Sequence, residues 1–132
     1  MPYTIFMFVT RKPGMTLEAF VDHYEKKHIP LVLEVLGDQA PVRHTRHYVK
    51  RNPAAAEGND VPPPLVFFGD AATIDYDCIT TVELRDEAHF QAFNEQFANS
   101  PRKKELEDDQ AAFADGTRFR VVAVESPRVT EP

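Results

Sequence analysis

The chain has 132 residues, of which 42% are apolar, and it carries a formal net charge of −6 at pH 7. This length suits one domain, residues 1–132, and the apolar content is too high for a disordered chain, while the scattered basic residues exclude the basic face of a nucleic-acid-binding protein. The single cysteine, Cys78, excludes an internal disulfide, and no signal peptide or membrane-spanning run is recognisable, so we expect a cytoplasmic protein without a nucleic-acid or membrane partner.

Residues 3–10, YTIFMFVT, form the first predicted strand, because they are β-branched and aromatic almost throughout. Both alternating faces of this strand are largely apolar, which is typical of a strand that is covered on both sides. Pro13 and Gly14 then predict a turn into the next element.

The segment from Thr16 to Leu36 is predicted to be an amphipathic helix, with Thr16 as its N-cap and Gly37 just after its end. His28 lies one turn after Tyr24, the last residue of the helix's apolar stripe, at a position where the pattern expects an apolar residue. Pro30 predicts a kink or brief break just past His28, which would free space around the imidazole. The stripe itself contains Leu17, Phe20, Val21 and Tyr24.

Residues 41–51, PVRHTRHYVKR, form the second predicted strand. Because side chains alternate along a strand, His44 and Arg46 share one face and His47 lies on the other, although the pattern does not say which face points inward. Residues 52–73 follow as a long proline-rich loop with an apolar segment, LVFF. Two interpretations of this loop stay open: a lid or partner-binding arm, or a surface insertion that folds back on its own domain.

The second half of the chain is predicted to contain two more strands and two helices. Residues 74–84 form the third strand, and Asp86 caps a helix in which three phenylalanines follow at helical spacing and His89 is partly exposed. Ser100 and the proline after it start a shorter, mostly polar helix. Residues 117–125, TRFRVVAVE, form the fourth strand.

The order of these elements predicts an α+β fold of the ferredoxin-like βαββαβ plan, with a four-stranded antiparallel sheet. Right-handed connections place the helices on one face of this sheet. The first and fourth strands are apolar on both faces, so the opposite face of the sheet needs a second layer. The simplest second layer is the sheet of a second copy of the chain. We therefore expect a homodimer that packs sheet against sheet, a dimeric α+β barrel.

The helix segment FVDHYEKKHIPLV resembles the F-x-x-Y-x-x-x-H-x-P-L signature of the EthD family, within the dimeric α+β barrel superfamily. The residues that fill the signature are Phe20, Tyr24, His28, Pro30 and Leu31. The segments YD at 76–77 and HYVKRN at 47–52 add to the resemblance, which covers nearly the whole chain. The loop at 52–73 is longer and richer in proline than the family pattern.

This resemblance implies a homodimer with a pocket in each subunit between the sheet and the helices. It also implies a cofactor-free tailoring enzyme, a decarboxylase, dehydratase, cyclase or isomerase that acts on an aromatic polyketide in secondary metabolism. The expected partner is therefore a small polyphenolic substrate, with no cofactor.

Cofactor-free chemistry on a polyphenolic ketone needs a group that moves a proton near neutral pH and a donor that holds the developing oxyanion. His28 suits the first task because the pKa of histidine lies near physiological pH. Asp77 is the second catalytic candidate, either orienting an imidazole or carrying a proton itself. The alternatives are a core histidine bonded to a backbone carbonyl and a strand aspartate bonded to the backbone.

Several polar and aromatic side chains are candidates for binding the substrate. Arg46 is suited to a substrate carboxylate and Tyr24 to an oxyanion, although a solvated face and simple packing are the alternatives for these two. The full set of candidates is Tyr24, His44, Arg46, Tyr48, Phe6, Phe8, Phe67 and Phe68. No metal site is expected, because His44 and His47 lie on opposite strand faces and His23 and His28, five apart on a helix, point in different directions.

Three functions stay open at this point. The first is the cofactor-free lyase or isomerase of aromatic polyketide metabolism. The second is a cofactor-free monooxygenase, an oxidoreductase that converts an anthrone-like phenol into a quinone through a carbanion that reacts with oxygen. The third is a non-catalytic dimer that binds a small aromatic molecule or a partner.

Overall fold

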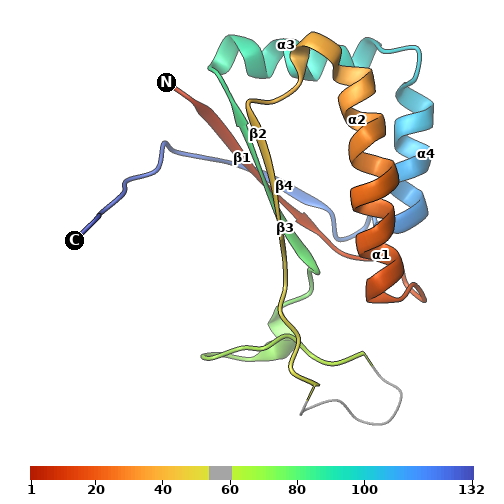
Figure 1. The fold of residues 1–132 in the computed structure, drawn as a ribbon, viewed down its shortest axis with the longest axis vertical. Helices are drawn as coiled ribbons and strands as arrows, with labels where there is room; N and C mark the ends of the chain where they lie inside the picture. The colour runs from red at the N-terminus through yellow and green to blue at the C-terminus, as the bar shows by residue number, and fades with distance from the viewer. Residues whose placement is uncertain (54–60) are drawn as a thin grey trace.

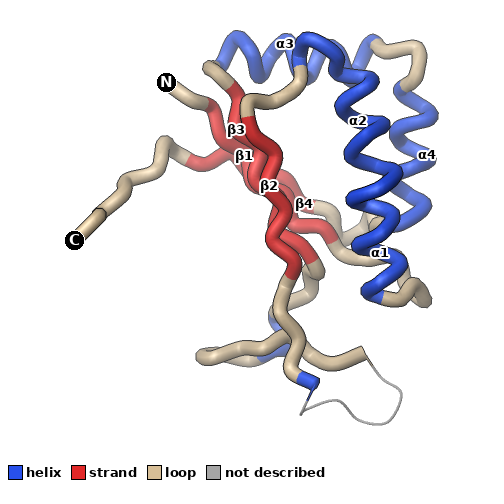
Figure 2. The backbone as a smooth tube through the Cα atoms, viewed as in Figure 1, coloured by secondary structure: helices blue, strands red, loops and turns tan. Residues whose placement is uncertain are grey.

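The computed structural model describes residues 1–53 and 61–132. Within them lies a sheet of four antiparallel strands in the order β2-β3-β1-β4, with the helices gathered on one side of it (Figures 1 and 2). This arrangement confirms the predicted ferredoxin-like α+β fold. The strands are β1 (Tyr3–Val9), β2 (Arg43–Tyr48), β3 (Cys78–Leu84) and β4 (Arg120–Val124). The main helices are α1 (Leu17–His23), α2 (Ile29–Leu36), α3 (Glu87–Asn99) and α4 (Lys103–Phe113).

The predicted caps fix the ends of these helices. The hydroxyl of Thr16 accepts a hydrogen bond from the backbone N–H of Ala19 at 3.1 Å, and a carboxylate oxygen of Asp86 accepts one from His89 at 2.8 Å. Each bond satisfies an N–H group that the first helical turn leaves without a partner. Gly37 ends α2 with a positive φ of 53°, a conformation that favours glycine.

The predicted break after His28 is wrong, because the chain stays helical through Pro30. The irregularity comes earlier, as a π-helical segment, η1 (Tyr24–His28), between α1 and α2. Here the N–H of Ile29 donates to the carbonyl of Tyr24, five residues back. Pro30 lacks an N–H and its ring would collide with the carbonyl four residues back in a regular helix, so a wide turn at this place accommodates it.

Strand register decides which side chains face the helices. Ile5, Met7 and Val9 of β1 stand opposite Val82, Thr80 and Cys78 of β3, which in turn pair with His44, Arg46 and Tyr48 of β2. All of these side chains share the helix side, since registered partners on adjacent strands point the same way. His44 and Arg46 therefore face inward, a point the alternation alone had left open, and His47 faces outward.

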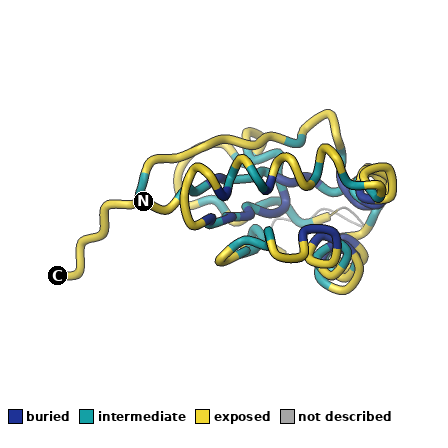
Figure 3. Tube along the Cα trace, turned by 90° about the horizontal axis from the view of Figure 1, so that it is seen from above, coloured by how far each residue is buried: buried dark blue, intermediate teal, exposed yellow. Residues whose placement is uncertain are grey.

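The opposite face of the sheet, here called the outer face, is half-exposed and partly apolar. Its side chains are Thr4, Phe6 and Phe8 of β1, Val122 and Val124 of β4, and Ile79 and Thr81 of β3. The side chain of Val122 is 48% exposed, and those of Phe6 and Phe8 are only half-buried. Figure 3 shows how the chain after β4 extends away from the body, exposed along most of its length.

The described part of the proline-rich loop, residues 61–73, projects beyond one end of the sheet (Figure 1). At its base the N–H of Asn52 donates to the carbonyl of Pro63, and the N–H of Leu65 donates to that of Lys50, both at 2.8 Å. Residues 54–60 of the predicted 52–73 loop lie outside the described residues. Both interpretations of this loop, a lid or partner-binding arm and a surface insertion that folds back on its own domain, therefore stay predictions. None of the helices in the described part of the chain is both long and apolar enough to span a bilayer.

Candidate active site

A cavity of about 680 Å³ lies between the inner face of the sheet and the helices. Its walls are mostly apolar, and the phenylalanines that line it come from α3, from α4 and from the residue just before β4: Phe90, Phe93, Phe97, Phe113 and Phe119. Seven residues with polar side chains also border it: Tyr24, His28, His44, Asn94, Lys103, Glu107 and Gln110. An apolar cavity of this size with a few convergent polar groups is typical of small-molecule sites, which span roughly 300–1,000 Å³.

His28 forms a buried pair with Asp109 of α4. Its Nδ1 lies 2.8 Å from Asp109 Oδ2, and both side chains are almost fully buried. A carboxylate only accepts hydrogen bonds, so Nδ1 carries the proton and donates to Asp109. In the neutral ring Nε2 then has the free lone pair of a base. His28 is also one of the residues that line the cavity.

His23 shares the same carboxylate. Its Nε2 donates to Asp109 Oδ1 at 2.9 Å. In a regular helix two residues five apart point about 140° away from each other. The π segment removes this difference by adding a residue to the turn, so the expectation that His23 and His28 point in different directions is wrong.

Burial and the partner's charge shift the pKa of each member of the His28–Asp109 pair in opposite directions. Burial lowers the pKa of His28 below its usual value, although the Asp109 carboxylate acts to raise it. Burial acts to raise the pKa of Asp109, but hydrogen bonds from His28 and His23 bring it below its usual value. At neutral pH the site therefore holds a neutral imidazole oriented by an ionised carboxylate.

Tyr24 stands between His28 and His44, with ring centroids 5.9 Å and 6.4 Å away. Its hydroxyl shares a hydrogen bond of 2.7 Å with the hydroxyl of Thr80. Burial raises the pKa of Tyr24 well above its usual value, so the phenol stays protonated. Tyr24 borders the cavity, as predicted for a substrate-binding residue, with its hydroxyl already paired to Thr80.

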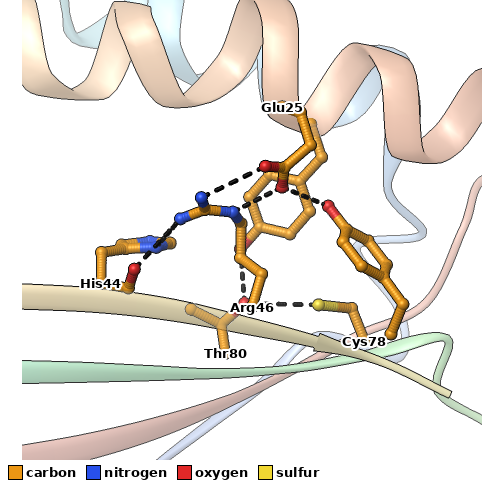
Figure 4. A network of polar contacts seen from close by, with 7 residues as sticks. Glu25, His44, Arg46, Cys78 and Thr80 are labelled. Carbon is orange, nitrogen blue, oxygen red and sulfur yellow. Dashed lines mark hydrogen bonds and ion pairs between the residues drawn. The ribbon is translucent and has the colours of Figure 1, made fainter.

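A polar network joins β2 to the π segment (Figure 4). Arg46 Nε and Nη2 donate to the two carboxylate oxygens of Glu25 at 2.5 Å and 3.2 Å, and Tyr48 donates to the same carboxylate at 2.5 Å. Arg46 Nη1 lies 2.8 Å from Nδ1 of His44. The guanidinium is thus occupied by Glu25 and His44, which corrects the expectation that Arg46 holds a substrate carboxylate.

The structure does not bring Asp77 to His28. Asp77 lies just before β3, where it pairs with Arg51 and accepts the backbone N–H of Arg11 at 2.7 Å. It does not line the cavity. The partner predicted to orient the imidazole is therefore corrected from Asp77 to Asp109.

The remaining predicted substrate contacts also lie outside the cavity. Phe6 and Phe8 are on the outer face of the sheet, because they alternate with the inward side chains of β1. Phe67 and Phe68 are on the projecting loop and are 93% and 98% exposed. Tyr48 faces the helix side but belongs to the Glu25 network and not to the cavity lining. Of the predicted binding residues, Tyr24 and His44 line the cavity.

Asp109 and Glu25 are the site residues that sequence reasoning missed. Asp109 falls three residues after Leu106 and four before Phe113, and all three are buried on one face of α4. A carboxylate inside an apolar stripe at helical spacing is a usable signal for a buried partner. Glu25 gave no such signal, because it lies in a charged run with two lysines.

Half-buried His44 makes the stability of this fold dependent on pH. Burial first, and then the charge of Arg46, lowers the pKa of His44 from 6.5 to about 4. Between these values the unfolded chain binds more protons than the folded chain, so the stabilisation is complete above the higher value and is lost as the pH falls toward the lower one. We expect His44 to contribute about 2–3 kcal/mol to the decrease in unfolding free energy between pH 7 and pH 4.5.

Urea unfolding of wild type and His44→Asn at several pH values measures this contribution. The pH dependence should be shallower in His44→Asn, while His47→Asn, on the exposed side of the same strand, should follow wild type. Equal pH dependence in wild type and His44→Asn would contradict the assignment.

No group of three or more His, Cys, Asp or Glu side chains within residues 1–53 and 61–132 is arranged to hold a metal ion. Among the described residues, the cavity offers a neutral histidine base, a carboxylate that orients it and hydrogen-bond donors in apolar surroundings.

Comparison with known proteins identifies relatives by family and by fold. The model of the EthD domain family matches residues 12–117. No curated protein sequence matches the chain. An EthD-like protein from Ralstonia eutropha is 17% identical with a TM-score of 0.55, covering 99% of this chain and 95% of that one.

Two further solved structures resemble this one. An ethyl tert-butyl ether D (EthD) family protein from Bacillus halodurans is 14% identical with a TM-score of 0.56, covering 95% of this chain and 99% of that one. A hypothetical protein from Arabidopsis thaliana is 15% identical with a TM-score of 0.50, covering 98% and 92%. At these identities the likeness concerns the fold.

Proposed function

The chain belongs to the EthD domain family, and from this premise we propose that it is a cofactor-independent enzyme that moves protons on a flat aromatic substrate. The substrate class is a polyphenolic ketone or acid of the aromatic polyketide type, from secondary metabolism. The reaction class is that of a lyase or isomerase: decarboxylation, dehydration or cyclisation.

The observation that carries this proposal is the His28–Asp109 pair at the wall of the apolar cavity. An imidazole whose Nδ1–H is held by a carboxylate presents Nε2 as a base, and the carboxylate stabilises the imidazolium that forms. In dehydration or cyclisation, His28 removes a proton beside a carbonyl group. In decarboxylation, neutral His28 takes the proton of the substrate carboxyl group and delivers it to the ring carbon that loses carbon dioxide.

The shape and lining of the cavity support an aromatic substrate. Phenylalanines from α3, from α4 and from the residue just before β4 offer apolar and edge contacts to a fused-ring system. Few polar groups compete for the substrate, and the cavity has room for a molecule of drug size. Exclusion of water from such a site strengthens each remaining hydrogen bond to the substrate oxygens.

We also propose that the protein is a homodimer through the outer face of the sheet. Phe6, Phe8 and Val122 lie half-exposed on the outer face. Together they form an apolar surface that a second copy of the chain would cover. Packing two such sheets face to face is a recurrent way to bury them.

Incubation of the enzyme with a panel of anthraquinone- and anthrone-type acids tests the function, with product mass and oxygen uptake recorded together. We expect a product that has lost carbon dioxide or water, formed without oxygen uptake. Oxygen uptake with a quinone product would replace the proposal by a monooxygenase. Unchanged compounds that raise the melting temperature would replace it by a binding protein.

A further inference from the structure

The two imidazoles that border the cavity are held by different kinds of group. His28 comes from the π segment and is bonded at Nδ1 to a carboxylate. His44 comes from the edge strand β2 and is bonded at Nδ1 to a guanidinium. Tyr24 lies near both rings, at centroid distances of 5.9 Å and 6.4 Å, and all three residues line the cavity.

The guanidinium determines which nitrogen of His44 carries the proton. Arg46 has five N–H donors and no acceptor, so His44 Nδ1, 2.8 Å from Arg46 Nη1, must be the acceptor. A neutral ring whose Nδ1 accepts carries its proton on Nε2. Nε2 of His44 is therefore a hydrogen-bond donor, whereas Nε2 of His28 is an acceptor.

A chain of contacts keeps Arg46 in this position. Glu25 holds the guanidinium through both carboxylate oxygens, and Tyr48 donates to the same carboxylate. Arg46 Nη1 also donates to the backbone carbonyl of His44 at 3.2 Å. A bidentate pair of this kind restricts the orientation of the guanidinium more than a lysine could.

The charged and titratable groups around His44 favour its neutral form. Burial lowers its pKa to about 4, and the positive charge of Arg46 and the nearby His28 act in the same direction. Glu25 acts in the opposite direction but is already paired with Arg46. Tyr24, the remaining titratable group that faces His44, stays protonated.

We infer that His44 donates its Nε2–H to the substrate oxygen on which negative charge develops, and that Arg46 is the positioning residue that fixes this tautomer. The inference rests on the proposed function, because it assigns the oxyanion donor to the same cavity as the base. The assignment also restricts which substrates fit. A substrate must place a carbonyl or phenol oxygen at His44 while the atom that exchanges a proton, a carbon or an oxygen, lies at His28.

The tautomer can be measured without any substrate. Two-bond proton–nitrogen correlation spectra of the imidazoles report which nitrogen of His44 is protonated. We expect an Nε2–H tautomer between pH 6 and pH 8 in wild type and a mixture of tautomers in Arg46→Met. Arg43→Met is the matched control, since Arg43 lies on the same strand with its side chain on the outer face.

Addition of 2-hydroxyanthraquinone to wild type then tests the donor role. We expect the Nε2–H resonance of His44 to move downfield together with a change at His28. A change at His28 without one at His44 would overturn the donor role and leave the proposed function standing. A change at neither ring would overturn both, and an Nδ1–H tautomer of His44 would overturn the positioning role of Arg46.

Turnover of a substrate found in the panel separates positioning from folding. His44→Phe, which removes the donor, should lower kcat by roughly 100-fold, the usual loss for one oxyanion donor. His44→Gln, which restores an N–H donor, should recover part of this activity. Arg46→Met should also lower kcat, because part of His44 then carries its proton on Nδ1 and cannot donate from Nε2. Equal kcat values for Arg46→Met and wild type would overturn the positioning role.

Discussion

Replacement of His28 by alanine should lower kcat/KM by roughly 100- to 10,000-fold, the contribution of a positioned general base. The expected cause is loss of an imidazole that borders the cavity and is oriented by Asp109. Asp109→Asn should lower activity over the same range, because an amide cannot stabilise the imidazolium and can reverse the tautomer of His28. Steady-state kinetics on a substrate identified by product mass measures both effects.

Two matched variants make this result specific to the site. His23→Asn removes the second histidine from Asp109 but leaves the bond to His28, so it should cost much less activity. His47→Ala, on the outer face, should leave activity unchanged. Denaturant unfolding of each variant checks the fold, since losing one partner of a buried pair costs about 1–3 kcal/mol.

The pH profile of wild type gives a second reading of His28. Burial lowers the pKa of this imidazole, and a base must be unprotonated to act. We expect kcat/KM to rise through a midpoint below the ordinary histidine value and to stay level through neutral pH. Unchanged turnover in His28→Ala would return His28 to a structural role and remove the main support for the proposed reaction.

Conversion of the dimer to a monomer is expected when a charge is placed on the outer face of the sheet. Val122→Glu puts a carboxylate on a half-exposed position of β4, so the single chain should still fold. In a two-fold interface the substitution occurs twice, and burying an unpaired charge costs several kcal/mol each time. At about 3 kcal/mol per copy the dimer should weaken roughly 10⁴-fold.

Light scattering at micromolar protein concentration measures this change. Wild type should give twice the chain mass of 15.0 kDa, and Val122→Glu should give the mass of one chain. Leu33→Glu is the matched control, because Leu33 on α2 is 43% exposed, close to the 48% of Val122, and lies on a helix. A wild-type mass of 15.0 kDa over this concentration range would exclude the sheet-to-sheet dimer.

Several features of the protein follow from the sequence because they depend on near neighbours. The caps Thr16 and Asp86 and the glycine after α2 mark helix ends that the structure confirms. Alternation along β2 separates His44 and Arg46 from His47, as the register shows. The apolar stripe of the first helix places Tyr24 and His28 toward the core. These patterns repeat over a few residues, so local physical chemistry determines them.

Other features depend on packing between distant parts of the chain. His28 and Asp109 are 81 residues apart, and α4 brings them together only once it lies against the π segment. The π turn itself changes which residues share a helix face, so a regular helical wheel separates His23 from His28.

The sequence thus determined the ferredoxin-like plan and the inward histidine. The tertiary structure decided the partner of that histidine, the occupation of Arg46 by Glu25 and the removal of Asp77 and the exposed phenylalanines from the site. The physical reason is that hydrogen-bond partners are selected by distance and angle in space, and these are set by how helices and strands pack rather than by spacing along the chain.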